Sequence, residues 1–255
     1  MTKNKRLQEI RKLLEVESEV QNAELAERFK VSEMTIRRDI DLLSKDAAII
    51  RTRGGAYLAP VSQQSEPSYT FRLQESSAVK EQIASKAAEI MQDHMNIFLD
   101  SGTTTECVLK YVDKRKRYMV ITNGINIAAE LVNHSQISSV LIGGDFRTNT
   151  LSTAGPTAEE QVKKFRFDVA FLGVNAIDAE GNAYVGTTLE VGLKHSIIEN
   201  SARCYVLADS TKFDSYNLVS YVNISAISGV ITDSGISKEI LEHMQSRHVK
   251  VIIAD

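Results

Sequence analysis

The stretch that most constrains this chain is residues 31–39, Val-Ser-Glu-Met-Thr-Ile-Arg-Arg-Asp. Ser32 is a favourable helix N-cap, because its hydroxyl can accept a hydrogen bond from an unpaired amide of the first turn. Beyond the cap, Ile36, Ile40 and Leu43 recur with helical spacing and form one apolar stripe. The stretch therefore predicts a helix with a buried face and a polar face.

A second short helix is expected immediately before this one. Residues 22–29 carry Leu25 and Phe29 on one face, and only two residues separate them from the Ser32 cap. A connection that short makes two helices cross steeply, as in a helix-turn-helix. The alternative is a helical hairpin inside an ordinary bundle.

Adjacent arginines beside hydroxyl groups suit contacts with DNA phosphates and base edges. We predict that either Arg37 or Arg38 reads a guanine edge while the other contacts phosphate. The candidate DNA-binding residues of this helix are Ser32, Glu33, Thr35, Arg37 and Arg38.

The flanking segments fit a winged helix. Residues 3–16 predict an amphipathic helix, 17–21 a polar connection, and 48–58 two short strands joined by a Gly-Gly turn. Arg51 and Arg53 would lie on or beside the wing, where they would reach the DNA backbone or the minor groove. The alternative is that both belong to a solvated hairpin.

The chain has 255 residues and 43% hydrophobic content, enough for two domains or one large one. It has no apolar run of membrane-spanning length, and its N-terminus leads into a charged helix, so we expect a cytoplasmic protein. Cys107 and Cys204 lie far apart without clustered histidines, which favours two core thiols over a disulfide or a zinc site. No metal or other cofactor is predicted.

Charge is distributed unevenly along the chain, whose formal net charge is −3. Residues 1–60 carry twelve Lys and Arg against ten Asp and Glu, whereas residues 61–255 carry eighteen against twenty-three. A basic tip on an acidic body is compatible with DNA binding, because phosphate contact depends on where the cations lie.

The remainder of the chain alternates helical and apolar strand patterns after a linker at 59–74, whose first part holds two of the three prolines. Short Val, Ile and Leu runs between helices predict an open α/β domain at 75–255 with a mostly parallel sheet. Its ligands should bind at the carboxyl ends of the strands. The predicted strands are 96–99, 118–122, 139–142, 168–172, 204–207, 226–231 and 250–253.

Polar residues follow the strand at 96–99 directly. Asp100, Ser101 and Gly102 lead into three threonines at 103–105, where a helix should begin. A glycine turn, first-turn amides and four hydroxyls can hold a phosphate ester, and without a Walker lysine they do not suggest NTP hydrolysis. The alternative is that one hydroxyl merely caps the helix.

Similar residues after other strands, Asn123-Gly124 and Gly143-Gly144, outline the same rim. Glu190 and Lys194, four residues apart, either reach that rim or form an ordinary surface pair worth roughly 0.3 kcal/mol.

The segments 25–40 and 51–56 together closely resemble the signature of DeoR-type bacterial transcriptional regulators. The resemblance continues through the body at 100–104, 122–124, 143–144, 167–174 and 208–213, and so covers nearly the whole chain. Two residues depart from the family pattern: Ala47 stands where glycine is common, and Arg53 where histidine is common. Both departures concern the wing rather than the helix.

The resemblance implies a regulator of sugar catabolism, usually a repressor, with a winged helix-turn-helix at 1–58 and a sensor domain at 75–255 similar in fold to ribose-5-phosphate isomerase. It implies double-stranded operator DNA and a phosphorylated sugar as partners. Because one winged helix buries limited surface, we also expect a homo-oligomer, dimer or tetramer, that reads two half-sites. The candidate effector-binding residues are Asp100, Ser101, Gly102, Thr103, Thr104, Thr105, Asn123, Gly124, Gly143, Gly144, Asn175, Glu190, Lys194 and Lys212.

The likeness to an isomerase supplies a competing hypothesis, a sugar-phosphate isomerase with an appended DNA-binding domain. Those enzymes use the acidic residues of a Gly-Ala-Asp-Glu motif in proton transfer, whereas this chain has Gly-Val-Asn-Ala at 173–176. Without a carboxylate base at that place we expect binding without turnover, and we predict no catalytic residue. The remaining candidates for a base are Asp178, Glu190 and Asp209.

Overall fold

The computed structural model describes residues 2–17, 19–44, 49–52, 54–58, 69–74 and 77–255. Contacts divide the chain into two compact units, Met1–Phe71 and Arg72–Asp255, and each has its own hydrophobic core. The elements before residue 59 are α1 (Lys3–Glu17), β1 (Glu19–Gln21), α2 (Asn22–Phe29), α3 (Glu33–Leu43), β2 (Ile49–Arg51) and β3 (Gly55–Leu58).

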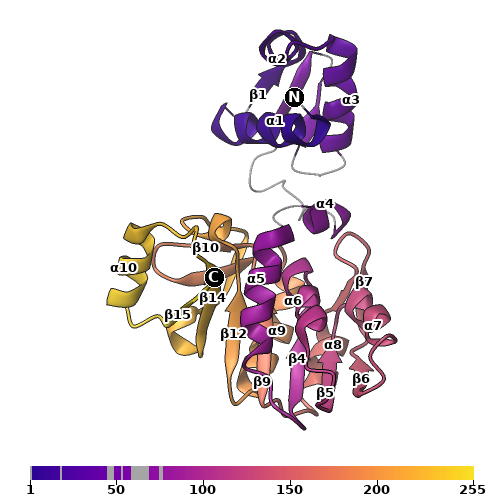
Figure 1. Cartoon of the computed structure of the whole chain (residues 1–255), viewed down its shortest axis with the longest axis vertical. Helices are drawn as coiled ribbons and strands as arrows, with labels where there is room; N and C mark the ends of the chain where they lie inside the picture. Colours follow the sequence, from indigo (N-terminus) through magenta and orange to yellow (C-terminus); the bar gives the residue numbers. More distant parts are fainter. Residues whose placement is uncertain (1, 18, 45–48, 53, 59–68, 75–76) are drawn as a thin grey trace. The chain divides into compact units, whose positions relative to one another are not determined.

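The first unit is a winged helix, as predicted, in which three helices pack beside a small antiparallel sheet of order β1-β3-β2 (Figure 1). Helix α2 ends where Lys30 adopts a left-handed conformation, with φ 53°, and caps the helix C-terminus. Helix α3 begins at the predicted Ser32 cap, whose Oγ accepts a hydrogen bond from the Thr35 amide at 3.3 Å. Ile36 and Ile40 of α3 lie in the core of this unit.

One prediction in this unit is wrong. Residues 17–21 are not simply a connection, because Glu19–Gln21 form β1, which pairs with β3 and sets Val20 opposite Ala56. Only Val20 of the three is buried, and a single buried residue is too short a pattern to reveal a strand. Gly55 permits the close pairing, since a Cβ there would lie 1.8 Å from the Val20 carbonyl oxygen.

The second unit is built on a parallel sheet whose seven strands, within the described residues, follow the order β15-β14-β12-β9-β4-β5-β6 (Figure 1). The prediction of an open α/β domain is therefore confirmed. The strands are β4 (Asn96–Leu99), β5 (Tyr118–Thr122), β6 (Ile137–Leu141), β9 (Val169–Gly173), β12 (Cys204–Leu207), β14 (Gly229–Asp233) and β15 (Val251–Ala254).

Helices lie on both faces of this sheet. The α-helices of this unit are α5 (Ser77–Ala88), α6 (Thr103–Cys107), α7 (Ile125–Leu131), α8 (Pro156–Val162), α9 (Val191–Glu199) and α10 (Lys238–Ser246). Helix α4 (Tyr69–Gln74) precedes them and spans the boundary between the two units, Phe71 and Arg72. The 3-10 turns are η2 (Val108–Tyr111), η3 (Thr188–Glu190), η4 (Ser210–Lys212) and η5 (Ile224–Ala226). No helix in the described residues is both long and apolar enough to cross a bilayer.

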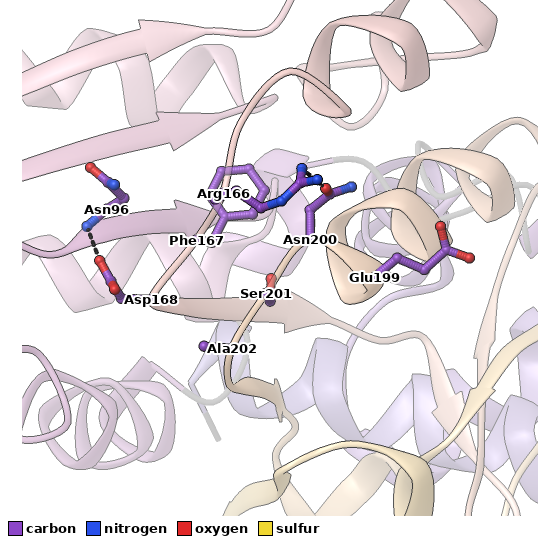
Figure 2. A pocket seen from close by; sticks show the side chains of 8 residues that line it. All are labelled: Asn96, Arg166, Phe167, Asp168, Glu199, Asn200, Ser201 and Ala202. Carbon is purple, nitrogen blue, oxygen red and sulfur yellow. Dashed lines mark hydrogen bonds between the residues drawn. The ribbon is translucent and has the colours of Figure 1, made fainter.

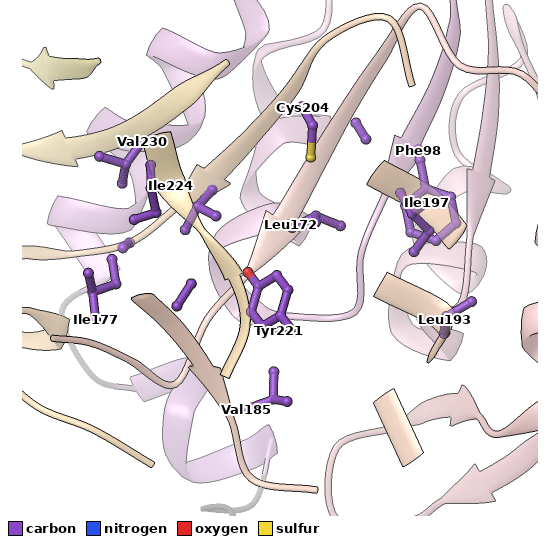
Figure 3. Packing of buried hydrophobic residues seen from close by; sticks show 14 of the residues in the cluster. Phe98, Leu172, Ile177, Val185, Leu193, Ile197, Cys204, Tyr221, Ile224 and Val230 are labelled. Carbon is purple, nitrogen blue, oxygen red and sulfur yellow. The ribbon is translucent and has the colours of Figure 1, made fainter. Parts of the chain in front are cut away.

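Alternate side chains of each strand point to opposite faces and feed two separate cores. Ile97 and Leu99 of β4 pack in the core that includes residues of α5, α6 and α7. Phe98, between them, packs in the other core with Leu193 and Ile197 of α9 (Figure 3). The central strands are thus covered on both sides, which explains their nearly continuous apolar sequences.

Short strands outside the main sheet escaped prediction. They form a hairpin of β7 (Asp145–Arg147) and β8 (Ser152–Ala154), and an antiparallel sheet of β10 (Ala176–Ile177), β11 (Asn182–Val185) and β13 (Val219–Asn223). Segments of two to five residues carry too little periodicity to be recognised.

Two further differences concern predicted boundaries. The strand expected at 226–231 begins only at Gly229, whose φ is +133°, and Ile224–Ala226 form η5 instead. Within the expected linker, residues 59–68 lie outside the described residues, whereas Tyr69–Gln74 form helix α4.

Candidate functional site

Helix α3 presents a polar face to solvent. Of the candidate residues on it, Ser32, Glu33, Arg37 and Arg38 are exposed and Thr35 is half-buried. Arg37 Nη2 lies 3.6 Å from Glu33 Oε2, and 46% of the Arg37 side chain remains exposed. An exposed pair of this kind is weak, so the Arg37 guanidinium stays accessible to a partner, and the Arg38 side chain is exposed beside it.

The inner side of α3 is fixed by an ion pair that the sequence did not suggest. Arg6 of α1 donates from Nε to Asp39 Oδ2 at 2.5 Å, and both residues are buried. Asp39 directly follows the two exposed arginines, so its pairing with α1 orients their helix within the unit.

The predicted wing cations have separate outcomes. Arg51, at the end of β2, forms an ion pair with Asp41 of α3, and about half of each side chain stays exposed. Arg53 and Ala47 lie outside the described residues.

The sheet of the second unit has its topological switch between β4 and β9, because the chain proceeds to β5 on one side of β4 and returns to β9 on the other. Ligands of open α/β sheets bind beyond the carboxyl ends of the strands at such a switch. Asp100 follows β4 and Gly173 ends β9, and Asp100 Oδ2 accepts a hydrogen bond from the Gly173 amide at 2.9 Å.

Lys194 of α9 completes a buried cluster at this switch. Its Nζ forms an ion pair with Asp100 and also donates to the Gly173 carbonyl oxygen at 3.1 Å. The Tyr221 hydroxyl of β13 donates to the same carbonyl oxygen at 3.1 Å, and Lys194 Nζ lies 5.0 Å from the centre of the Tyr221 ring. Asp100 and Lys194 are each 2% exposed, so they form the floor of the switch region.

Burial raises the pKa of the Tyr221 hydroxyl well above its usual value, and the Asp100 carboxylate adds to that effect. Burial also raises the pKa of the Cys204 thiol in this core to about 12. Tyr221 therefore stays a protonated donor at neutral pH, and Cys204 is an unreactive core residue, as predicted. Cys107 is likewise a buried free thiol.

The loop above this floor is held by Asn123, which follows β5. Asn123 Oδ1 accepts from the Ser101 amide at 2.9 Å, while its Nδ2 donates to the Thr153 carbonyl oxygen at 3.0 Å. Ser101 and Thr104 are half-buried and Thr103 is buried. The asparagine thus joins the loop after β4 to the β7–β8 hairpin.

Thr105 and Gly102 serve the loop itself. The Thr105 hydroxyl is fully buried and can donate to the carbonyl oxygens of Asp100 and Gly102, at 2.6 and 2.9 Å. Gly102 has an extended backbone, and a Cβ there would lie 3.1 Å from Thr105 Oγ1. A hydroxyl already satisfied within the loop has no hydrogen to offer a ligand, so Thr105 differs from the other candidates.

The remaining glycine candidates also fit close packing. A Cβ on Gly124 would approach Ser101 Cα to 3.2 Å, and one on Gly144, whose φ is +149°, would lie 2.5 Å from the Ala154 carbonyl oxygen. The Gly143 amide donates to Gln161 Oε1 at 3.0 Å. The last of these contacts joins the start of the hairpin segment to α8.

Glu190 and Lys194 do not form the surface pair considered as an alternative, which is therefore wrong. Lys194 turns inward to Asp100, whereas Glu190 forms an ion pair with Arg147 of β7, with both side chains mostly buried. Helix α9 and its preceding turn thereby join the switch floor to the hairpin. Asn175, in the loop after β9, and Lys212, the last residue of η4, are both half-buried.

Sequence reasoning missed Arg147, Tyr221 and Thr153. Each reaches the candidate residues from an antiparallel strand that was itself unpredicted. For Arg147, the sequence offered one signal, its position a few residues after Gly143-Gly144. Its partner Glu190 lies 43 positions away, so spacing did not reveal the pair.

An open cavity of about 370 Å³ lies at the opposite edge of the sheet (Figure 2). Its lining residues are Asn96, Arg166, Phe167, Asp168, Glu199, Asn200, Ser201 and Ala202. Asn96 opens β4 and Asp168 precedes β9, so this cavity is at the amino ends of the strands and contains none of the candidate residues. Among the described residues, no group of three His, Cys, Asp or Glu side chains could hold a metal ion.

Comparisons with known proteins identify both units. A DeoR-like helix-turn-helix domain matches residues 6–60, and the DeoR C terminal sensor domain matches residues 75–234. The glycerol-3-phosphate regulon repressor of Escherichia coli (strain K12) is 30% identical over 251 residues, which cover 98% of this chain and 99% of that protein. The lactose phosphotransferase system repressor of Lactococcus lactis subsp. lactis is 31% identical over 257 residues, with 100% of both chains covered.

Among solved structures, ribose 5-phosphate isomerase A from Methanocaldococcus jannaschii is similar to 55% of this chain over 55% of its own, with a TM-score of 0.40 and 16% identity. The sequence relatives are matched from end to end, and the two domain types occur in the order seen in the structure. This chain belongs to the DeoR family of helix-turn-helix transcriptional regulators.

Proposed function

We propose that this chain represses genes of carbohydrate use and that a phosphorylated sugar, bound beyond the carboxyl ends of β4, β5 and β9, controls its affinity for operator DNA. The names of two relatives, which refer to a glycerol-3-phosphate regulon and a lactose phosphotransferase system, support this class of effector. The single observation that carries the proposal is the buried Asp100–Lys194 pair beneath a hydroxyl-rich loop at the topological switch of the sheet.

For DNA binding, the exposed face of α3 is the proposed contact surface. Arg37 and Arg38 are the main contacts, supported by Ser32, Glu33 and Thr35 at the start of the helix. Arg51 is a further phosphate contact from the end of β2, and Arg53 is proposed from sequence alone. A homodimer or larger assembly would present two such helices to two half-sites, because one winged helix buries limited surface.

The DNA-binding proposal is tested with Arg37→Ala combined with Arg38→Ala. Specific operator affinity should fall by about 100-fold, since each arginine contact is worth roughly one to two powers of ten. The control is Lys114→Ala with Arg115→Ala, which removes the same charge from an exposed part of the second unit. Equal losses in both variants would mean that net charge, rather than α3, determines binding.

For the effector, the proposed phosphate contacts are Ser101, Thr103, Thr104 and the adjoining loop amides, with Gly102 and Gly124 allowing close approach. Sugar hydroxyls would contact Asn123, Asn175 and Lys212, while Asp100 and Lys194 form the floor. Glu190 acts through Arg147, and Gly143 and Gly144 shape the hairpin. We leave Thr105 out of the contact set because its hydroxyl is satisfied inside the loop.

Calorimetry against glucose 6-phosphate, fructose 1-phosphate, ribose 5-phosphate and glycerol 3-phosphate tests this site. Ser101→Ala with Thr104→Val should weaken the best-bound compound by about 10-fold or more, because two hydrogen bonds to a charged group are lost. Ser138→Ala with Ser139→Ala, which removes two exposed hydroxyls of β6, should leave binding unchanged. Failure of all four compounds to bind the wild-type chain would refute this effector class.

Binding without turnover is the expected behaviour. The loop after β9 carries Asn175 instead of a carboxylate, and Asp178 is engaged by Asn182 and Tyr184. Glu190 is engaged by Arg147, and Asp209 Oδ1 accepts from the Thr211 amide at 3.1 Å. Each acidic candidate for a base therefore already has partners, and steady formation of an isomerised sugar phosphate would contradict the proposal.

A further inference from the structure

Lys80 is a buried lysine that neither proposed site uses. It lies on α5, is 5% exposed, and its Nζ donates a hydrogen bond to the main-chain carbonyl oxygen of Arg72 in α4. A charged ammonium in the interior is costly unless it is hydrogen-bonded. The hydrogen bond to the Arg72 carbonyl oxygen therefore helps to offset the desolvation of the Lys80 ammonium.

The acceptor belongs to a helix that needs such support. Helix α4 has only six residues, and a helix that short is not stable in isolation. Arg72 is among its last four residues, whose carbonyl groups have no donor within the helix. A cation at the C-terminal end of a helix is also favourable for the helix dipole. Lys80 thus holds α4 to α5.

The neighbouring residue joins α5 to the proposed effector loop. Glu81 accepts from Lys110 Nζ at 2.6 Å and from the Tyr111 hydroxyl at 3.4 Å, and both donors belong to η2. Turn η2 directly continues α6, which begins at Thr103. Ile83, Ala84 and Ala87 of α5 also share a core with Cys107, Val108 and Leu109. One face of α5 is therefore packed against α6 and η2, while Lys80 on the same helix contacts α4.

We propose that Lys80 is a positioning residue that transmits effector occupancy from the loop at 101–105 through α6 and α5 to α4, and so to the segment that leads to the DNA-binding unit. This inference rests on the effector site proposed above. It requires that the effector favour one position of α6 over another, since a ligand with equal affinity for both would shift nothing.

The contact is tested without any ligand by Lys80→Met, which keeps a long apolar side chain and removes the ammonium. Trypsin can cleave after Arg72 only when α4 opens, so the cleavage rate reports how often it opens. Loss of the charge-assisted hydrogen bond from Lys80 should make α4 open more often and raise that rate by about 10-fold. The control is Lys86→Met on the same helix, where Lys86 forms an exposed pair with Glu89 at 2.8 Å. An unchanged rate after Arg72 in the full-length Lys80→Met protein would overturn the inference.

Transmission is tested with the best-bound sugar phosphate of the panel. In the wild-type chain it should change operator affinity by about 10-fold, within the usual range of allosteric coupling. In Lys80→Met the change should fall below about 2-fold, while sugar-phosphate affinity and ligand-free operator affinity stay as in wild type. A merely structural role would weaken both affinities instead, and a full-sized response in Lys80→Met would contradict transmission.

The two proposals fail in different ways. If no compound of the panel binds the wild-type chain, the effector proposal is wrong, and the tryptic rate after Arg72 still decides whether Lys80 holds α4. If a compound binds and shifts operator affinity equally in both proteins, the effector proposal stands and the role of Lys80 is wrong.

Discussion

Both units bury an ion pair, but the two pairs lie in different surroundings. In the winged helix, Arg6 pairs with Asp39 between α1 and α3, behind the face that carries the exposed arginines. In the sensor, Asp100 pairs with Lys194 at the switch of the sheet, directly before the loop that begins at Ser101. The first pair orients a surface from behind, whereas the second is part of the candidate site.

The difference matters because a buried ion pair is weak support for stability as such. Its desolvation cost can equal or exceed its Coulombic gain, yet removal of one partner leaves an uncompensated charge. A pair that only orients a helix should be replaceable by apolar residues of similar shape. A pair that also contacts a ligand should not be replaceable in this way, because the apolar residues would not bind the ligand. Replacement therefore distinguishes an orienting pair from a ligand-binding pair.

The largest effect is expected for Lys194→Met, which leaves Asp100 buried without its cation. The second unit should lose about 4 kcal/mol of stability, and sugar-phosphate binding should be lost. Asp100→Asn combined with Lys194→Met should regain most of the stability but not the binding, as measured by urea unfolding and calorimetry. Lys163→Met, which breaks an exposed pair with Glu159, is the control. If the double variant regained ligand affinity, the Asp100–Lys194 pair would have only an orienting role, like the Arg6–Asp39 pair.

Arg6→Met should have the next largest effect, about 3 kcal/mol, because the Arg6 side chain is 9% exposed and water can reach it slightly better. Operator binding should weaken as α3 loses its support, while the heat of sugar-phosphate binding stays unchanged. Lys12→Met on the same helix, whose side chain is 70% exposed, should do neither. If Arg6→Met also lost sugar-phosphate binding, the effect of the substitution would not be confined to the first unit.

The two units also differ in how far their sequences predict them. In the winged helix, the Ser32 cap and the Ile36 and Ile40 stripe are local patterns, and they define α3 correctly. The exception is β1, whose identity depends on pairing with β3 far along the chain. Local periodicity thus predicts helices well and short paired strands poorly.

In the sensor, sequence predicted which loops lie at the carboxyl edge, because parallel strands all end there. It did not predict their partners. Lys194 meets Asp100 across 94 positions and Glu190 meets Arg147 across 43, and such pairings follow from how α9 packs over the sheet. No spacing rule contains that packing, so the surface-pair alternative for Glu190 and Lys194 could be excluded only by the structure.

Asp178 differs from Asp39 and Asp100 because its carboxylate accepts hydrogen bonds from neutral groups and has no cation among those partners. Asp178 accepts from the Asn182 amide at 2.8 Å, Asn182 Nδ2 at 2.9 Å and the Tyr184 hydroxyl at 2.8 Å. Burial opposes its charged form, but these hydrogen bonds together lower the pKa of Asp178 below its usual value. Asp178→Ala should cost about 1–2 kcal/mol, less than either broken ion pair.

The pH dependence of this contribution has a definite sign. A carboxyl whose pKa is lower in the folded state stabilises the fold above its unfolded pKa of about 4, and that contribution disappears as pH falls through the lowered value. The stability difference between wild type and Asp178→Ala, measured by urea unfolding, should therefore shrink from pH 6 towards pH 3. A difference that stays constant over this range would show that the hydrogen bonds do not depend on charge.

The smallest effect is expected where a pair is exposed rather than buried. Arg51 and Asp41 are 52% and 47% exposed, so Asp41→Asn should change stability by less than about 1 kcal/mol. It also frees Arg51, so operator affinity should rise by a few-fold, whereas Arg51→Ala should lower it and reduce the salt slope by about one. Gel-shift titrations at several salt concentrations measure both effects. If neither variant alters the salt slope, Arg51 belongs to a solvated hairpin, and contact with DNA rests on the face of α3 that the buried Arg6–Asp39 pair orients.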